Sequence, residues 1–219
     1  MRADLLCRQT YFVGWLDEKI VHMNVAPRTL NIPNLITLSR LVLTLVVLIF
    51  ISLEKYWIAT TGIFIFAVAT DFLDGYLARK WNQVTALGRI LDPFVDKMII
   101  GGTMIFLVAQ PLSGVTAWMT FVVIAREMFI TGLRSVLEGQ GVDFSARLSG
   151  KLKMLLQSIV IPLSLLSLSP AFQTWSDTGF SLFVVVRDVL LWTMVFITVY
   201  SGLEYVIRGW QAMRLPKAS

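Results

Sequence analysis

Long apolar stretches alternate with short polar ones along the chain. Six apolar stretches can be marked, at residues 35–53, 57–78, 91–110, 115–136, 150–169 and 184–206. Each is about 20 residues long, the length of helix that crosses the hydrocarbon core of a bilayer. The segments 98–125 and 154–176 contain no charged residue. The pattern therefore predicts an all-α, polytopic membrane protein with six transmembrane helices.

Composition narrows the class of protein. Of the 219 residues, 56% are hydrophobic and 15% are charged, whereas a soluble domain has about 45–50% apolar and about 25% charged residues. A soluble globular domain, a disordered chain, a collagen and a coiled coil are all excluded on these grounds. Cys7 is the only cysteine, which excludes an intrachain disulfide and a thiolate metal cluster.

Basic residues are distributed unevenly among the polar stretches. The connections Gln110–Gly114 and Ser169–Phe180 contain no Lys or Arg. Lys55 is expected in an outer loop and Arg187 near the outer interface, while most other basic residues fall on the opposite side. Because cytoplasmic loops carry an excess of Lys and Arg, we expect both termini inside. This bias also explains the net charge of +5, so we expect a phospholipid bilayer and no nucleic acid as the partner.

The chain before the first apolar stretch predicts a separate element. Apolar and basic residues recur there at helical spacing, as expected of an amphipathic helix lying on the cytoplasmic membrane face. The residues are Phe12, Trp15, Leu16, Lys19, Ile20 and Met23. The alternative is a helix that packs on protein and has no lipid role. We expect an N-terminal cytoplasmic segment at 1–34, a six-helix domain at 35–207 and a cytoplasmic tail at 208–219.

Four carboxylates interrupt the second and third apolar stretches near one membrane face. Asp71 and Asp74 are three residues apart, and Asp92 and Asp96 are four apart, so each pair lies on one face of its helix. The link 80–89 makes the two helices antiparallel neighbours, and the carboxylates can converge. Four such charges cannot all stay ionised without cations. Oxygen ligands without His or Cys favour magnesium or manganese, and their number suits two metal ions.

Small residues accompany these carboxylates. Gly75 and Ala78 follow Asp71 on the same helix face, where a diphosphate or a nucleotide could approach the backbone. The alternative for these two residues is tight packing between helices. The alternative for the aspartates is a set of ion pairs with Arg79, Arg89 and Lys97.

Together these positions form a motif, D-x-x-D-G-x-x-A-R-x(8)-G-x-x-x-D-x-x-x-D. The chain matches it at Asp71, Asp74, Gly75, Ala78, Arg79, Gly88, Asp92 and Asp96. The motif resembles the signature of the CDP-alcohol phosphatidyltransferases. The resemblance implies a homodimeric six-helix membrane enzyme with two divalent cations. Such an enzyme moves a phosphatidyl group from CDP-diacylglycerol to an alcohol and releases CMP.

The resemblance also implies roles for the residues of the motif. Asp71, Asp74 and Asp92 would be metal ligands, and Asp96 would be both a ligand and the general base for the acceptor hydroxyl. Residues of the motif and of the start of the first span would contact CDP-diacylglycerol. They are Asn34, Thr37, Arg40, Asp71, Asp74, Gly75, Ala78, Arg79 and Gly88.

A second polar cluster concerns the acceptor. Arg126, Arg134, Lys151 and Lys153 lie on the same side of the membrane as the aspartates and would suit an acceptor that carries a phosphate. Arg126 is about two turns inside its span and needs a partner, whereas the adjacent Glu127 is expected to point elsewhere on the helix. The alternative for each cation is snorkelling to lipid headgroups.

The stretches around this cluster resemble those of bacterial phosphatidylglycerophosphate synthases, a branch of the family. The branch implies glycerol 3-phosphate as the acceptor, and a bacterial cytoplasmic (inner) membrane with the active site facing the cytoplasm. Sister activities would instead use inositol phosphate, or phosphatidylglycerol as in a cardiolipin synthase. From other classes, a metal-ion transporter would need acids near the bilayer midplane with access from both sides, and a membrane scaffold would need no such acids.

Overall fold

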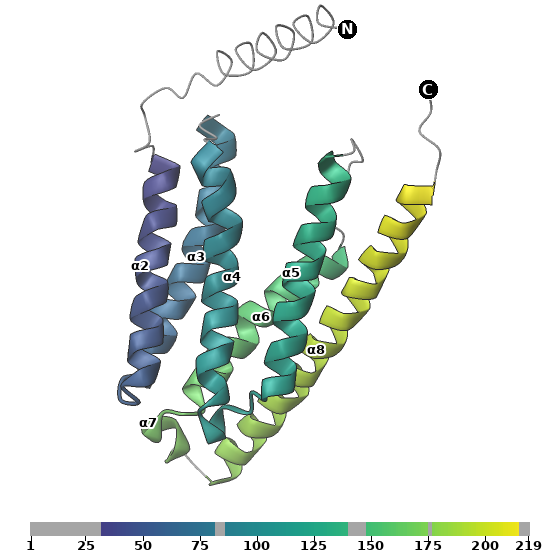
Figure 1. Ribbon diagram of the computed structural model, residues 1–219. Coiled ribbons are helices and arrows are strands. Elements are labelled where there is room, and N and C mark those ends of the chain that lie inside the picture. The colour runs from purple at the N-terminus through teal and green to yellow at the C-terminus, as the bar shows by residue number, and fades with distance from the viewer. Residues whose placement is uncertain (1–31, 82–85, 140–147, 175–176, 215–219) are drawn as a thin grey trace, which may run out of the picture.

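A computed structural model describes residues 32–81, 86–139, 148–174 and 177–214. Every regular element in these ranges is a helix, which confirms the all-α prediction (Figure 1). The elements are α2 (Ile32–Ser52), α3 (Trp57–Trp81), α4 (Ala86–Val108), the 3-10 helix η1 (Pro111–Ser113), α5 (Ala117–Gly139), α6 (Leu148–Leu166), α7 (Pro170–Gln173) and α8 (Asp177–Arg214). The amphipathic helix expected before the first span lies outside the described residues.

Three helices of the described chain are long and apolar enough to cross a membrane. Their apolar windows are Leu35–Ser52, Ser149–Leu166 and Gly179–Gln211, and Trp57–Thr70 is a shorter apolar stretch. α3, α4 and α5 are also 23–25 residues long, but acidic and basic residues interrupt their apolar sequences. The membrane character is thereby confirmed, while the count of six spans stays a prediction.

The helices form two groups, which a central helix and a direct contact between α4 and α5 join. α2 packs against both α3 and α4, and α5 packs against α8. α6 contacts α3, α4 and α8 and so connects the groups (Figure 1). Phe64, Met104, Leu107, Val160 and Met194 are fully buried in the shared core.

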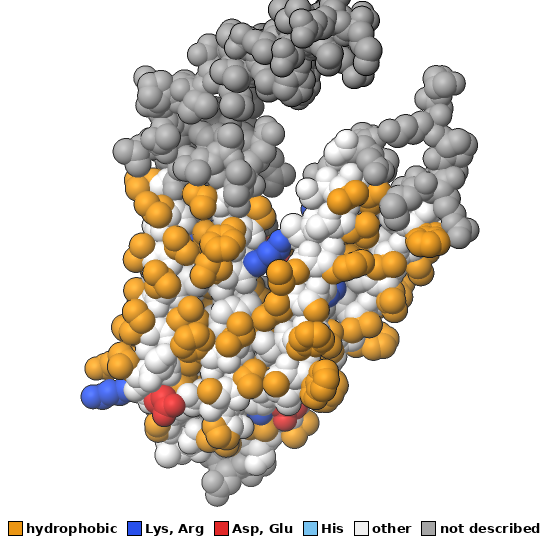
Figure 2. Space-filling view, in the orientation of Figure 1, with side chains coloured by type: hydrophobic (Ala, Val, Ile, Leu, Met, Phe, Trp, Pro, Cys, Tyr) orange, Lys and Arg blue, Asp and Glu red, His pale blue; other side chains and the backbone are white. Residues whose placement is uncertain are grey.

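The outer surface of the bundle is apolar. Figure 2 shows hydrophobic side chains spread over the whole described face. Trp118, Phe121, Met128 and Phe196 are more than half exposed, an arrangement that suits lipid rather than water as the surrounding medium.

The connections expected at Gln110–Gly114 and Ser169–Phe180 both begin shortly after the end of a long helix. Gln110 precedes η1, which begins at Pro111, and α6 ends at Leu166 shortly before Pro170 starts α7. Both connections begin at one end of the bundle, called here the η1 end. Gly114 has a φ of +71° there, a left-handed conformation in which glycine is favoured.

Two predicted element ends differ from the structure. α3 continues to Trp81 and α4 begins at Ala86, so the expected ten-residue link at 80–89 is too long. Ala78, Arg79 and Lys80 are good helix formers, and leaving the apolar stretch does not end a helix. α8 likewise continues past residue 206, the expected end of the last span, to Arg214.

Candidate active site

A cavity of about 550 Å³ opens between α4, α5 and α6. It collects Asp96 from α4, Arg126 and Arg134 from α5, and Lys151 and Lys153 from α6. The structure thus brings the predicted general base and all four cations of the predicted acceptor cluster to one space. A volume of this size is typical of small-molecule sites.

Helical spacing explains how each helix faces the cavity. On α4 the lining residues include Pro93, Asp96, Lys97 and Ile100, which recur at intervals of three and four as one helix face requires. α3 contributes Val68. The cavity wall is therefore a mixture of charged groups and apolar side chains, as in a site that holds a polar ligand away from bulk water.

Asp96 is held from a neighbouring helix. Nη2 of Arg40, on α2, lies 3.6 Å from Oδ1 of Asp96. The Arg40 side chain is only 2% exposed, whereas that of Asp96 is 38% exposed. A buried guanidinium therefore fixes one oxygen of a carboxylate that still reaches the cavity. Thr37, one turn earlier on α2, is also buried, so the predicted donor contacts Thr37 and Arg40 share a helix face beside Asp96.

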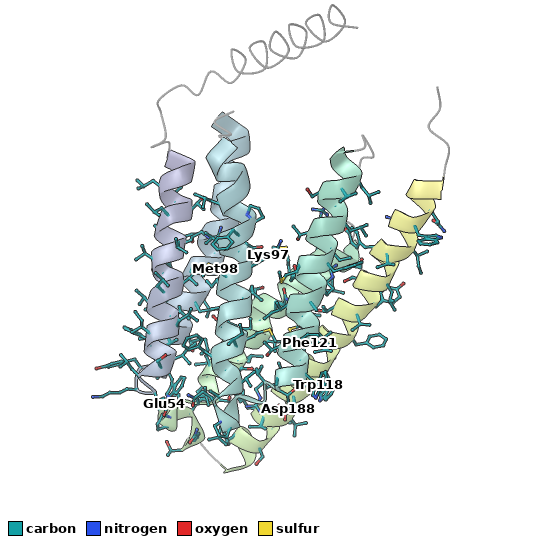
Figure 3. All side chains as sticks on the ribbon, viewed as in Figure 1. Glu54, Lys97, Met98, Trp118, Phe121 and Asp188 are labelled. Atoms are coloured by element: carbon teal, nitrogen blue, oxygen red, sulfur yellow. The ribbon has the colours of Figure 1, made fainter. Side chains whose placement is uncertain are left out.

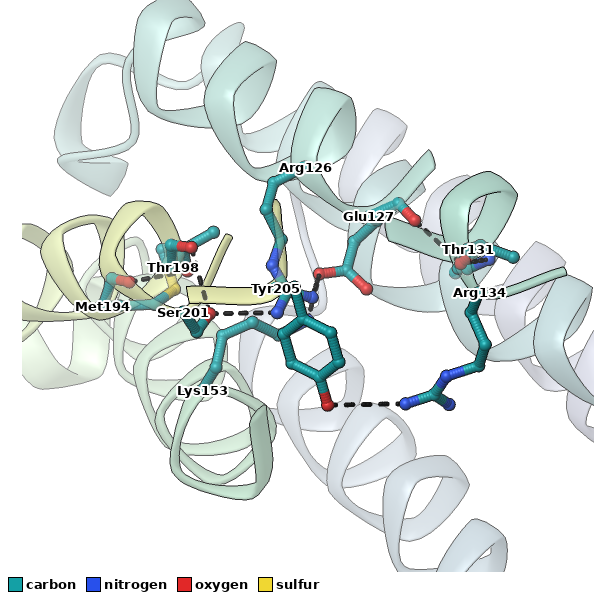
Figure 4. Close-up of polar contacts among 10 residues, drawn as sticks. Arg126, Glu127, Thr131, Arg134, Lys153, Met194, Thr198, Ser201 and Tyr205 are labelled. Atoms are coloured by element: carbon teal, nitrogen blue, oxygen red, sulfur yellow. Dashed lines mark hydrogen bonds and ion pairs between the residues drawn. The ribbon is translucent and has the colours of Figure 1, made fainter. Parts of the chain in front are cut away.

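Glu127 lies at the centre of a charged network (Figure 4). Its Oε1 is 3.3 Å from Nη1 of Arg126 and accepts a hydrogen bond from Nζ of Lys153. The expectation that Glu127 points away from Arg126 is wrong. Backbone positions one residue apart diverge on a helix, but both side chains are long, and Lys153 on α6 attracts the carboxylate to the same side.

α8 supports the two arginines in a way that the sequence did not reveal. Arg126 donates from Nη2 to Oγ of Ser201 over 3.0 Å. Tyr205 is buried, and both guanidinium groups lie close to its ring. The distance from the ring centroid is 5.6 Å to Cζ of Arg126 and 6.0 Å to Cζ of Arg134. Arg134 donates from Nη2 to the Tyr205 hydroxyl over 3.5 Å. A Cβ at Gly202 would lie 3.1 Å from Cγ of Arg126, so glycine leaves room for that side chain.

The remaining cations line the cavity in different settings. Lys153 is buried, whereas Lys151, two residues away and so on another face of α6, is exposed. Lys97 donates a hydrogen bond from Nζ to the hydroxyl of Thr131 and so connects α4 with α5. Figure 3 shows Lys97 near the middle of α4, whereas Glu54 and Asp188 lie towards the η1 end.

Most of the predicted metal and donor residues are placed by their backbones alone. Asp71 and Asp74 lie within α3, and Asp92 and Asp96 within α4, so each pair has the helical spacing that the prediction requires. Asp96 is the one predicted ligand whose side chain is described. Among the described side chains, no group of three or more His, Cys, Asp or Glu residues is close enough to hold a metal ion.

The predicted metal ligands are of the kind that binds hard divalent cations. They are four carboxylates at helical spacings of three and four residues, and Asp96, the one whose side chain is described, keeps part of its carboxylate open to the cavity. Oxygen-only ligands of this kind suit magnesium or manganese. The surroundings of Asn34, Gly75, Ala78, Arg79 and Gly88 lie outside the described part of the molecule, so their contacts with CDP-diacylglycerol stay predictions.

Comparison with known proteins identifies the family. The model of the CDP-alcohol phosphatidyltransferase family matches residues 30–204. The chain belongs to this family. The match covers α2 to α7 and most of α8, and it confirms the resemblance drawn from the aspartate motif.

Curated relatives carry a more specific name. The chain is 37% identical over 198 residues to a CDP-diacylglycerol–glycerol-3-phosphate 3-phosphatidyltransferase of Bacillus subtilis, covering 84% of this chain and 97% of that protein. A Pseudomonas fluorescens protein of the same name is 31% identical over 196 residues, covering 84% and 93%. One from Salmonella choleraesuis is 34% identical over 170 residues, covering 75% and 91%.

Proposed function

We propose that the protein transfers the phosphatidyl group of CDP-diacylglycerol to glycerol 3-phosphate, producing phosphatidylglycerophosphate and CMP. The observation that carries this proposal is the cavity in which Asp96 faces Arg126, Arg134, Lys151 and Lys153. The names of the similar proteins support the same acceptor. The sister activities and the transporter have no comparable support.

The cations of the cavity can neutralise the negative charge of the acceptor. Glycerol 3-phosphate carries a phosphate dianion, which four nearby aspartates would repel. Arg126 and Arg134 can donate charge-assisted hydrogen bonds to that phosphate. Nε of each arginine is buried and has no hydrogen-bond partner among the described residues, so both retain a donor. Glu127 holds Arg126 and Lys153 together and keeps the two like charges in one place.

Asp71, Asp74, Asp92 and Asp96 would hold two divalent cations, magnesium or manganese. When bound, such ions polarise the diphosphate and neutralise the developing charge on the leaving CMP. Gly75, which follows Asp74, and the other predicted donor contacts would bind the nucleotide and the phosphates. Those other contacts are Asn34, Thr37, Arg40, Ala78, Arg79 and Gly88.

Asp96 performs the proton transfer. Its carboxylate takes the proton of the acceptor hydroxyl while the hydroxyl oxygen attacks the phosphorus of the phosphatidyl group. A new P–O bond forms, the P–O bond to CMP breaks, and CMP leaves with the electron pair of that bond. Arg40 keeps the carboxylate directed into the cavity during this step.

The membrane arrangement completes the proposal. The chain would cross a bacterial cytoplasmic (inner) membrane six times as a homodimer, with both termini and the cavity on the cytoplasmic side. The lipid tails of the donor then remain in the bilayer while its headgroup enters the cavity. The exposed apolar side chains of the outer surface, Trp118 and Phe196 among them, support the lipid setting.

The test is a CMP-release assay with the purified full-length chain, CDP-diacylglycerol and magnesium. Glycerol 3-phosphate, glycerol, an inositol phosphate and phosphatidylglycerol are offered separately as acceptors. We expect release to depend on glycerol 3-phosphate and the lipid product to be phosphatidylglycerophosphate. Release that depends on another acceptor, or none with any of them, overturns the proposal.

A further inference from the structure

Gln157, on α6, is a cavity residue to which the proposed reaction gives no task. It lines the cavity and is only 2% exposed. Its amide nitrogen Nε2 is buried and has no hydrogen-bond partner in the described part of the chain. Burying an amide without a hydrogen bond is costly. A partner from outside the protein, such as a ligand in the cavity, is therefore expected.

The position of Gln157 places it next to the charged network. Gly150, Lys153 and Gln157 line the cavity at intervals of three and four residues, along one face of α6. Lys153 is engaged by Glu127, and Gln157 follows it by one helical turn. Apolar side chains such as Val123 and Ile100 line the cavity as well. Along α6 the cavity wall therefore changes from a cation to a neutral polar group.

The chemistry of an amide indicates which ligand group it would bind. A primary amide offers two donors and a carbonyl acceptor on one uncharged group. A hydroxyl also both donates and accepts, so it can pair with either end of the amide. A phosphate dianion only accepts, and Arg126 and Arg134 already provide for it. Gln157 therefore matches a hydroxyl better than it matches a phosphate.

The proposed acceptor has one hydroxyl without an assigned partner. The cations are assigned to its phosphate and Asp96 to its reacting hydroxyl. The hydroxyl on the middle carbon of glycerol 3-phosphate remains without an assigned partner. We propose that Gln157 binds this non-reacting hydroxyl and makes the enzyme select an acceptor with two adjacent hydroxyls. This inference rests on the proposed function and adds a specificity-determining residue to it.

The test compares two acceptors that differ only in that hydroxyl. Glycerol 3-phosphate and 3-hydroxypropyl phosphate, which lacks the middle hydroxyl, are assayed by CMP release with the full-length enzyme. For the unaltered chain we expect kcat/KM to favour glycerol 3-phosphate by about ten- to a hundredfold, or roughly 1.4–2.7 kcal/mol. In Gln157→Met, which keeps the length of the side chain but lacks the amide, the preference should fall to within about threefold.

Ser158→Ala is the matched control. Ser158 lines the same cavity next in sequence, but its hydroxyl already donates to the carbonyl of Leu155 over 2.8 Å. The acceptor preference of this variant should equal that of the unaltered chain. A preference lost equally in Ser158→Ala would overturn the inference, because it would point to general disturbance of α6.

The remaining outcomes separate the inference from the proposed function. If the unaltered chain uses both acceptors equally well, Gln157 does not bind the middle hydroxyl. The inference is then overturned before any variant is measured. The same holds if Gln157→Met slows both acceptors by one factor and keeps the preference. If the unaltered chain uses neither acceptor, the proposed function fails and the inference fails with it.

Discussion

Two regions of the molecule contain an arginine that forms an ion pair with the acidic residue next to it in the sequence, but the surroundings of the two arginines differ. At the cavity, Arg126 is paired with the adjacent Glu127, and near the η1 end Arg187 is paired with the adjacent Asp188. Both arginines lie on long helices and are largely or fully buried. The sequence separates them only by the side of the membrane on which each is expected, since both are arginines followed by an acidic residue.

The two arginines differ in how many of their guanidinium nitrogens have a hydrogen-bond partner. Arg187 donates from Nη1 to the Leu112 carbonyl over 2.6 Å and to Oγ of Ser167 over 2.7 Å, and from Nε and Nη2 to Asp188 over 2.9 and 2.8 Å. Every nitrogen of that guanidinium has a partner. Arg126 lines the cavity, and its Nε has none among the described residues. A saturated arginine fastens helices together, whereas an unsaturated one beside a cavity can still bind a ligand.

The comparison predicts that changes at the cavity affect the reaction, and the largest effect should come from the metal ligands. Asp71→Asn, or excess EDTA with the unaltered chain, should abolish CMP release, because the carboxylates cannot hold the cations that polarise the diphosphate. The assay is CMP release with and without added magnesium. Full activity of Asp71→Asn in EDTA would contradict the metal assignment.

Asp96→Asn should lower kcat by about 10²–10⁴, the usual worth of a positioned general base. Much of the binding of CDP-diacylglycerol should remain, since an amide keeps the shape of the side chain. Steady-state rates and a binding measurement with the donor check this. A collapse of donor affinity with a preserved rate would show that Asp96 is mainly a binding residue.

Changes near the η1 end should affect stability instead. Arg187→Gln removes a buried guanidinium whose charge partner, Asp188, is 47% exposed, and with it the hydrogen bonds to Leu112 and Ser167. We expect the loss to cost about 1–3 kcal/mol and to lower Tm by roughly 2–10 °C in a chain of this size. Both KM values of the surviving enzyme should be unchanged. Thermal unfolding in detergent measures the effect, with Lys55→Gln as an exposed control at the same end. A Tm equal to that of the control would show that Arg187 is not a structural fastener.

Tyr205→Phe should have the smallest effect. The variant keeps the ring between Arg126 and Arg134 but loses the 3.5 Å hydrogen bond from Arg134. We expect KM for glycerol 3-phosphate to rise about two- to threefold, because a long hydrogen bond contributes well under 1.4 kcal/mol. Acceptor kinetics give the answer, and a tenfold rise would assign the hydroxyl a direct contact with the acceptor.

The sequence alone selected charged residues that line the cavity, for a physical reason. A carboxylate or a guanidinium within an apolar helix is costly and therefore conspicuous, so Asp96 and Arg126 could be selected without a structure. Neutral residues leave no such signal. Ser201, Tyr205 and Gln157 fit an apolar helix as lipid-facing or packing residues would, and their role follows from which helices meet.

The direction of Glu127 and the length of the α3–α4 link could not be predicted for related reasons. Helical geometry fixes where a Cβ points. The end of the long Glu127 side chain is positioned by Lys153, which is far away in the sequence but adjacent in space. The helix α3 extends to Trp81 because its polar residues also favour helix. Spacing predicts which residues share a face, whereas contacts between helices decide their partners.

The most direct test of the central claim compares Arg126→Gln with Arg187→Gln, measuring KM for glycerol 3-phosphate and for CDP-diacylglycerol in each. If the cavity cations bind the acceptor phosphate, Arg126→Gln raises the acceptor KM by roughly ten- to a hundredfold, since a charge-assisted hydrogen bond is worth about 1.5–3 kcal/mol. The donor KM stays unchanged, and Arg187→Gln moves neither constant. A rise in the donor KM of Arg126→Gln, or no change in either constant, would contradict the assignment of the cavity to the acceptor.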